Sequence, residues 1–221
     1  MERNSENIQF IDIHTHSLSG YSDQKELISF FHKSHIPNTS FFSIGIHPWH
    51  AEKASTDALL DQLYPKAYKA FAIGECGLDK ASSSNWDKQV EVFKTQIEIS
   101  EKLRKPLIIH AVKTYPDIIA LHKEYKPEQA WIIHGFTGNL QNMKACTNHG
   151  IYLSYGALLM RGIESFESVL KQTPNDLLFL ETDESNIEIR RIYERAAHLK
   201  NISLDTLAIQ IENNLKSIQH R

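Results

Sequence analysis

The sequence has few of the features that mark exported, membrane-spanning or multidomain proteins. Its 221 residues include only two cysteines, Cys76 and Cys146, without a Cys-x-x-Cys pair, and no apolar signal segment follows Met1. These absences argue against a disulfide scaffold and lead us to expect a cytoplasmic location. No apolar run reaches the roughly 20 residues that a membrane-spanning helix requires. Linkers rich in Gly, Pro or Ser are also missing, so we expect one domain over residues 1–221.

Excess positive charge is absent too. The formal net charge is −3, which argues against a protein that holds nucleic acid through a broad basic surface. Any contact with nucleic acid is therefore expected to be local. The hydrophobic content of 41% and the charged content of 23% are ordinary for a globular protein and argue against a disordered chain.

The hydrophobic pattern predicts an α/β fold. Seven short segments are nearly continuous in apolar residues, as expected for parallel strands that are covered on both faces. They lie at about Ile8–His16, Ser40–Trp49, Ala70–Asp79, Pro106–Val112, Ala130–Gly138, Gly150–Ala157 and Asp176–Asp183. Amphipathic stretches such as Asn85–Arg104 separate them and predict helices, and we expect a further helix near Gln24–Ser34. Strands that alternate with helices indicate a parallel sheet.

Histidine is abundant, with twelve in the chain, and several of its positions close the predicted strands. The carboxyl ends of parallel strands meet at one face, so we expect the polar groups found there to converge. These groups are His14, His16, Glu75, His110, His134 and Asp183. Four imidazoles and two carboxylates exceed one tetrahedral site and fit two divalent ions, with Glu75 as the bridge. Mixed nitrogen and oxygen ligands suit Zn, Mn, Ni or Co, and suit Mg less well.

Two further positions are assigned from the same pattern. Asp12 shares a strand face with His14 and His16, and we expect its carboxylate to orient an imidazole from outside the ligand set. His47 closes another strand and is expected either to contact substrate or to lie at the rim. A pair of metal ions can activate water and stabilise both oxygens of a displacement, so the predicted chemistry is hydrolysis.

These motifs resemble the TatD family of metal-dependent deoxyribonucleases, within the amidohydrolase-like barrels. The resemblance is carried by Asp12-Ile-His14-Thr-His16, Gly45-Ile-His47-Pro48, Gly74-Glu75-Cys-Gly77-Leu78-Asp79, Ile108-Ile109-His110, His134-Gly-Phe136-Thr-Gly138 and Leu180-Glu181-Thr182-Asp183. It implies a distorted TIM-type parallel barrel with helices outside and a 3′–5′ exodeoxyribonuclease activity. DNA or a small phosphodiester would be the bound partner, and no protein partner can be deduced.

The resemblance also implies roles for single residues. One metal ion would be held by His14, His16 and Asp183, and the other by His110 and His134, with Glu75 between them. Asp183 would position or deprotonate the attacking water, so Asp183 and Glu75 are the expected catalytic residues. His47, Lys113 and Gly138 are expected to contact substrate.

The sequence departs from the family pattern in three places. Only about 25 residues separate the first two predicted strands, so we expect seven strands instead of eight. The family has a phosphate-contacting arginine after its fourth-strand histidine, whereas this chain has Ala111-Val112-Lys113, and lysine lacks the bidentate fork of arginine. The loop after Asp183 is shorter and lacks the family's proline.

Two alternative functions stay open. The first is an amidohydrolase that cleaves a small amide, ester or lactone. Many such enzymes bridge their metals with a carboxylated lysine, and here no lysine closes a strand where Glu75 stands. The second is a metal-stabilised binding protein without catalytic activity, which the missing arginine would suit.

Overall fold

The computed structural model describes residues 9–36, 41–52 and 55–219. Within these residues, eight parallel strands form one sheet in the order β1 to β8. The strands are β1 Phe10–Thr15, β2 Gln24–Phe31, β3 Phe42–Gly45, β4 Ala72–Asp79, β5 Leu107–Val112, β6 Trp131–Ile133, β7 Tyr152–Tyr155 and β8 Leu178–Leu180. A parallel bridge between Thr15 and Asp183 joins the two edges. The predicted TIM-type barrel is thereby confirmed. Ile8 and Ser40, where two strands were expected to begin, lie outside the described residues.

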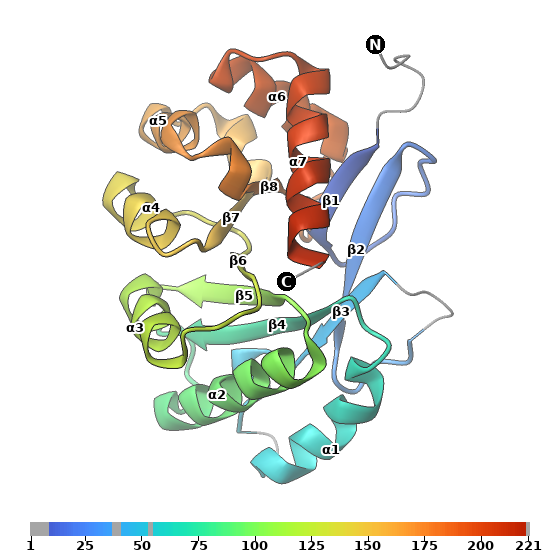
Figure 1. The fold of residues 1–221 in the computed structure, drawn as a ribbon, viewed down its shortest axis with the longest axis vertical. Coiled ribbons are helices and arrows are strands. Elements are labelled where there is room, and N and C mark those ends of the chain that lie inside the picture. Colours follow the sequence, from blue (N-terminus) through green and yellow to red (C-terminus); the bar gives the residue numbers. More distant parts are fainter. Residues whose placement is uncertain (1–8, 37–40, 53–54, 220–221) are drawn as a thin grey trace.

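Helices surround the barrel from α1 at the bottom of Figure 1, through α3 to α5 at the left, to α6 at the top. They are α1 Thr56–Ala67, α2 Trp86–Leu103, α3 Tyr115–Tyr125, α4 Leu140–Thr147, α5 Glu164–Gln172, α6 Ile189–Lys200 and α7 Leu204–Gln219. The helix expected over Asn85–Arg104 is α2, which begins after Asn85. The Asn85 side chain accepts a hydrogen bond from the backbone N–H of Lys88 at 3.1 Å, as an N-cap does.

The expected count of seven strands is wrong, because the predicted helix near Gln24–Ser34 is the strand β2. β2 pairs in parallel with β1 on one side and β3 on the other. Its early residues, Gln-Lys-Glu-Leu, favour a helix, whereas the Ile-Ser-Phe-Phe that follows suits a pleated strand. The segment forms a strand because it pairs with β1 on one side and with β3 on the other.

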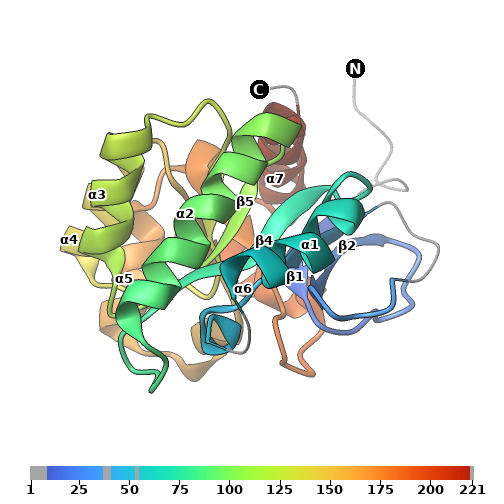
Figure 2. The same cartoon turned by 90° about the horizontal axis from the view of Figure 1, so that it is seen from below.

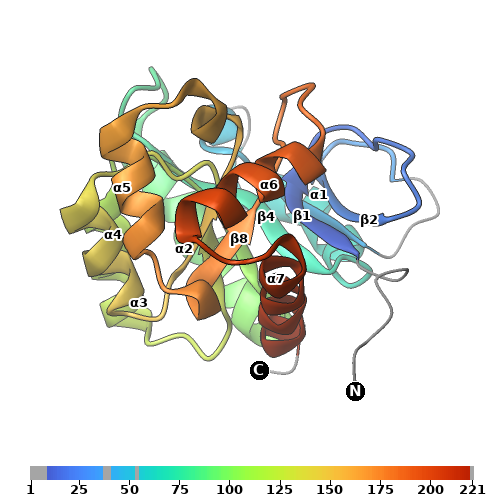
Figure 3. The ribbon, with the colours of Figure 1, turned by 90° about the horizontal axis from the view of Figure 1, so that it is seen from above.

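Among the described residues, the connections on either side of β2 lack a helix, whereas all eight strands are present. Described residues 32–36 and 41 between β2 and β3 contain no helix, nor do residues 16–23 between β1 and β2. Figures 2 and 3 show β1 and β2 on the side of the molecule away from α3, α4 and α5. β2 is largely half-buried, whereas β1, β3 and β4 are buried throughout.

Two glycines allow three strands to approach closely near the carboxyl end of β4. A Cβ on Gly77 would lie 2.3 Å from the carbonyl oxygen of His110 in β5, and one on Gly45 would lie 2.6 Å from the carbonyl oxygen of Glu75. Gly77 also has a φ of +133°, which only glycine adopts without strain. Because of these glycines, β3 and β5 lie directly against the segment that carries Glu75.

No helix among the residues described is both long and apolar enough to cross a membrane. The cytoplasmic location expected from the sequence stays a prediction.

Candidate metal centre

Glu75 lies at the centre of a ring of imidazoles. Its Oε1 is 2.8 Å from Nδ1 of His110, 2.9 Å from Nε2 of His134 and 3.2 Å from Nε2 of His47. Its Oε2 is 3.7 Å from Nε2 of both His14 and His16. Glu75 itself is only 5% exposed. One carboxylate from β4 thus faces five histidines, and its two oxygens divide them into two sets.

Asp183 also faces the second of these sets, which consists of His14 and His16. Its Oδ1 lies 3.6 Å from Nε2 of His14 and 3.5 Å from Nε2 of His16. Asp183 follows β8, and its backbone N–H donates to the carbonyl oxygen of His14 at 2.9 Å. The closure of the barrel therefore brings the carboxylate of Asp183 to the same two imidazoles that Oε2 of Glu75 faces.

Local irregularity of the strands helps to direct these side chains inward. The pairing of β1 with β2 changes register in the stretch from Asp12 to Thr15, which contains His14. The pairing of β4 with β5 changes register in the stretch from Ile73 to Cys76, which contains Glu75. Such irregularities turn the side chains of a strand away from the simple alternation and are common beside active sites.

The donor atoms fit a metal ion better than they fit one another. Both ring nitrogens of His14 are buried and have no hydrogen-bond partner. Its Nε2 is 3.6–3.7 Å from two carboxylate oxygens, too far for a hydrogen bond. Two ligands bonded to one ion at about 2.0–2.2 Å lie roughly 3.0–3.6 Å apart, close to the spacing seen here. The described residues therefore leave His14 unsatisfied, and its role as a ligand stays a prediction.

Three sets of described residues bring three donor atoms together as one ion would require. They are His14 with His16 and Glu75, His14 with His134 and Asp183, and His47 with Glu75 and His110. The six residues predicted as ligands all belong to these sets. Their allocation between two ions stays a prediction.

His47 belongs to the cluster more closely than the sequence indicated. It was expected to contact substrate or to lie at the rim, but it is only 5% exposed and its Nε2 faces Glu75. Its Nδ1 accepts a hydrogen bond from the backbone N–H of Trp49 at 3.2 Å, which leaves Nε2 to face the centre. The signal was present in the sequence, since His47 follows a buried strand as the other histidines do.

Two carboxylates that the sequence analysis left without a role contact the outer nitrogens of the imidazoles. Oδ2 of Asp79 lies 3.3 Å from Nε2 of His110, and Oε1 of Glu181 lies 3.5 Å from Nδ1 of His134. Carboxylates in this position fix the tautomer and orientation of a ligating histidine. Asp79 is four residues after Glu75 and Glu181 two before Asp183, so strand alternation could have identified both.

The orienting role predicted for Asp12 is not what its contacts support. Its carboxylate accepts hydrogen bonds from the hydroxyl of Thr182 at 2.6 Å, from the backbone N–H of Thr182 at 3.1 Å and from the backbone N–H of His14 at 3.3 Å. Burial raises the pKa of Asp12 to about 8. Asp12 therefore fastens β1 to the segment that carries Asp183, and acts on the backbone of His14 instead of its ring.

The electrostatics of the centre favour a cation. Burial alone would raise the pKa of Glu75, but His134, His110 and His47 outweigh it and hold that pKa well below its ordinary value. Burial alone would lower the pKa of His134, but Glu75 and Glu181 raise it well above its ordinary value. In the absence of a metal, the positive charge of a proton on His134 partly balances the negative charge of the buried carboxylates. A divalent ion would supply this positive charge instead.

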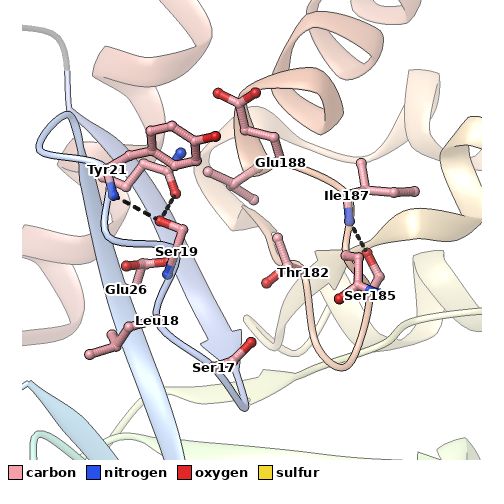
Figure 4. A pocket seen from close by; sticks show the side chains of 12 residues that line it. Ser17, Leu18, Ser19, Tyr21, Glu26, Thr182, Ser185, Ile187 and Glu188 are labelled. Atoms are coloured by element: carbon pink, nitrogen blue, oxygen red, sulfur yellow. Dashed lines mark hydrogen bonds between the residues drawn. The ribbon is translucent and has the colours of Figure 1, made fainter.

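A cavity of about 790 Å³ opens beside the cluster. Its lining includes His110, His134 and Asp183 together with Lys113 and Gly138, which were expected to contact substrate. Another pocket, of about 290 Å³, includes Thr182. Figure 4 shows this pocket between the segment of Ser17 to Tyr21 and the segment of Ser185 to Glu188. Substrate can therefore approach the cluster through the larger cavity, where Lys113 supplies positive charge.

The chain is similar to metal-dependent hydrolases over most of its length. It is 29% identical over 199 residues to the uncharacterized metal-dependent hydrolase YabD of Bacillus subtilis (strain 168), covering 80% of this chain and 76% of that protein. It is also 29% identical over 172 residues to the 3′-5′ ssDNA/RNA exonuclease TatD of Pectobacterium atrosepticum, covering 75% of this chain and 65% of that protein.

The fold has a close counterpart among solved structures. The TatD homologue YJJV of Escherichia coli K12 superposes with a TM-score of 0.82 over 96% of this chain and 98% of that one, at 22% identity. The barrel and its histidine–carboxylate cluster define a metal-dependent hydrolase. The chain belongs to the TatD related DNase family, whose model matches residues 3–220.

Proposed function

We propose that this protein is a two-metal phosphodiesterase that acts on nucleic acid, with 3′–5′ exonucleolytic cleavage as its activity. The observation that supports this most is the position of Glu75, whose two oxygens face two different sets of imidazoles. A carboxylate in this position can bridge two ions. Relatives named as TatD deoxyribonuclease or as 3′-5′ ssDNA/RNA exonuclease support the choice of substrate.

The chain's own groups would divide the work of binding and hydrolysis. Two divalent ions, when bound, would polarise the phosphoryl group and make water a stronger nucleophile at neutral pH. Asp183 is the group placed to orient that water. Burial would raise the pKa of Asp183, but His14 and His134 lower it, so the carboxylate is ionised at neutral pH and can accept a hydrogen bond from the water.

Outside the cluster, two residues support the reaction in different ways. Lys113 lines the cavity beside His110, where its ammonium can interact with a phosphate of the bound strand. Asp79 holds His110 from the outer side and keeps its Nδ1 directed at Glu75.

Attack on phosphorus forms the new P–O bond to the water oxygen as the P–O bond to the leaving alkoxide breaks.

The proposal is tested by hydrolysis of bis-p-nitrophenyl phosphate and of a short single-stranded oligonucleotide with added Mn²⁺, Co²⁺ or Mg²⁺. We expect turnover of both substrates, loss of turnover with a chelator, and loss in the Asp183→Asn variant. Metal-loaded protein that leaves both substrates intact would contradict the proposal.

The amidohydrolase alternative has no specific support in the site. Glu75, and not a lysine, lies between the two sets of imidazoles. A panel of lactones and dihydropyrimidines would detect such an activity. If none of these substrates is cleaved but the protein still binds metal, the noncatalytic binding function gains support.

A further inference from the structure

Trp49 is a large, exposed side chain that is nevertheless held in place beside the metal centre. It is 58% exposed, and its indole Nε1–H donates to Oδ2 of Asp79 at 2.7 Å. Its ring centroid is 4.7 Å from that of His47 at an interplanar angle of 80°, and 6.2 Å from that of His110 at 74°. A fixed indole with much of its surface in solvent is a preformed aromatic contact surface.

The hydrogen bond to Asp79 accounts for only part of this arrangement. Oδ2 of Asp79 accepts a hydrogen bond from the indole N–H and also lies 3.3 Å from Nε2 of His110, so the indole helps to hold Asp79 beside His110. The exposed ring surface adds nothing to that hydrogen bond. It costs free energy in water, since exposed aromatic area is poorly solvated. A ligand that covers the ring would recover this free energy.

We propose that the exposed surface of Trp49 stacks on a nucleobase of the substrate strand, adjacent to the phosphate at the metal centre. The inference rests on the proposed function, because it assumes a nucleic acid substrate. A phosphate held near Glu75 places its nucleosides within reach of Trp49, which packs on His47, and Nε2 of His47 is 3.2 Å from Glu75. Aromatic stacking on single strands tolerates any base, because every base has a π-face.

The scarcity of positive charge in the cavity supports the same conclusion. Lys113 is the one lysine or arginine among the described residues that line it, and the whole chain has a net charge of −3. Phosphate contacts alone therefore provide little affinity for the strand. Stacking supplies affinity without positive charge, and we expect it to contribute a factor of about 5 to 150 in binding.

Binding to short oligonucleotides tests the proposal without relying on turnover. The full chain carrying Asp183→Asn is loaded with Mn²⁺ and titrated into a labelled single-stranded oligonucleotide, with fluorescence anisotropy as the readout. A matched series of oligonucleotides carries an abasic residue at each of the last few positions. The variants are Trp49→Ala, Trp49→Phe and, as a control, Tyr68→Ala, since Tyr68 is equally exposed at 58% but follows helix α1.

We expect Trp49→Ala to raise the Kd for the intact strand about 5- to 150-fold. For the parent, an abasic residue at one position of the strand should weaken binding by the same factor. On that abasic strand, Trp49→Ala should bind no more weakly than the parent. Trp49→Phe should retain most of the affinity because the ring can still stack, and Tyr68→Ala should bind as the parent does. Metal content should be unchanged in all three variants.

Two results would overturn the inference. If Trp49→Ala weakens binding equally for intact strands and for every abasic strand, the residue acts only through Asp79 and His110. If the parent binds no oligonucleotide, or Trp49→Ala binds as tightly as the parent, there is no stacking contact. Hydrolysis of bis-p-nitrophenyl phosphate, measured separately on the chain with Asp183 intact, shows whether the phosphodiesterase function itself has failed.

Discussion

His14 and Asp183 are hydrogen-bonded through the backbone, and their side chains face each other without a hydrogen bond. The N–H of Asp183 donates to the carbonyl oxygen of His14 at 2.9 Å, and Oδ1 of Asp183 lies 3.6 Å from Nε2 of His14. Asp183 has a φ of +53°, in the left-handed region that few residues other than glycine adopt. The contact that closes the barrel therefore also forms one side of the metal centre, and fold and site are coupled at this point.

Replacing Asp183 with asparagine should separate catalysis from folding. Asparagine tolerates the left-handed conformation, and the backbone hydrogen bonds to β1 do not depend on the side chain. We expect the melting temperature of the metal-free protein to stay close to that of the parent. The kcat for bis-p-nitrophenyl phosphate should fall at least about 100-fold, as expected for loss of a group that orients the attacking water. A variant with parental kcat would remove Asp183 from the mechanism.

Replacing Glu75 with glutamine should reduce the number of bound ions. The amide keeps the shape of the side chain but loses the charge and the second anionic oxygen that a bridge between two ions requires. We expect metal content, measured by atomic emission after dialysis, to fall from two ions per chain to one or none. Glu98→Gln, on the exposed face of α2, is the matched control and should keep both ions. Two tightly bound ions in Glu75→Gln would show that Glu75 is not the bridge.

Metal binding should release protons and strengthen as pH rises. Burial opposes the charged form of His134, yet Glu75 and Glu181 raise its pKa well above the ordinary value in the metal-free protein. A metal ion binds only the neutral imidazole, so near pH 7 it must displace the proton. Apparent affinity should therefore increase from about pH 6 to pH 8. Calorimetry at one pH in Hepes and in Tris should give different heats, and equal heats would contradict proton release.

Gly77 should be among the positions least tolerant of a side chain. A Cβ there would lie 2.3 Å from the carbonyl oxygen of His110 at a φ of +133°, and we expect Gly77→Ala to lower the free energy of unfolding by about 3 kcal/mol. Gly162 also has a positive φ, +66°, but no atom within 4 Å, so Gly162→Ala should cost only about 1–2 kcal/mol. Urea unfolding measures both. Equal losses would mean that the close approach of β4 and β5 is not the cause.

The sequence predicts the clustering of the histidines and carboxylates better than it predicts the strand count. Histidines and acids that directly follow apolar strands must converge in a parallel barrel, so the positions of His110 and His134 could be predicted without coordinates. β2 could not, because its first residues favour a helix and only its pairing with β1 and β3 makes it a strand.

The outer contacts of the centre were harder to predict, because they depend on distances across strands. Asp79, Glu181 and Asp12 all follow or lie within buried strands, but the sequence analysis assigned an orienting role to Asp12 alone. Only the fold shows that Asp79 and Glu181 reach ring nitrogens while Asp12 reaches the backbone of His14. Trp49 gave no signal of its own, since its exposure beside His47 depends on the tertiary arrangement.

The most direct test of the account follows metal content and hydrolysis in the same samples. Protein stripped with a chelator is titrated with Mn²⁺, and bound ions per chain are measured alongside turnover of bis-p-nitrophenyl phosphate. We expect little turnover up to one ion per chain and a steep rise as the second ion binds. Full activity with a single ion, or two bound ions without hydrolysis of this substrate or of an oligonucleotide, would contradict a two-metal phosphodiesterase centred on Glu75.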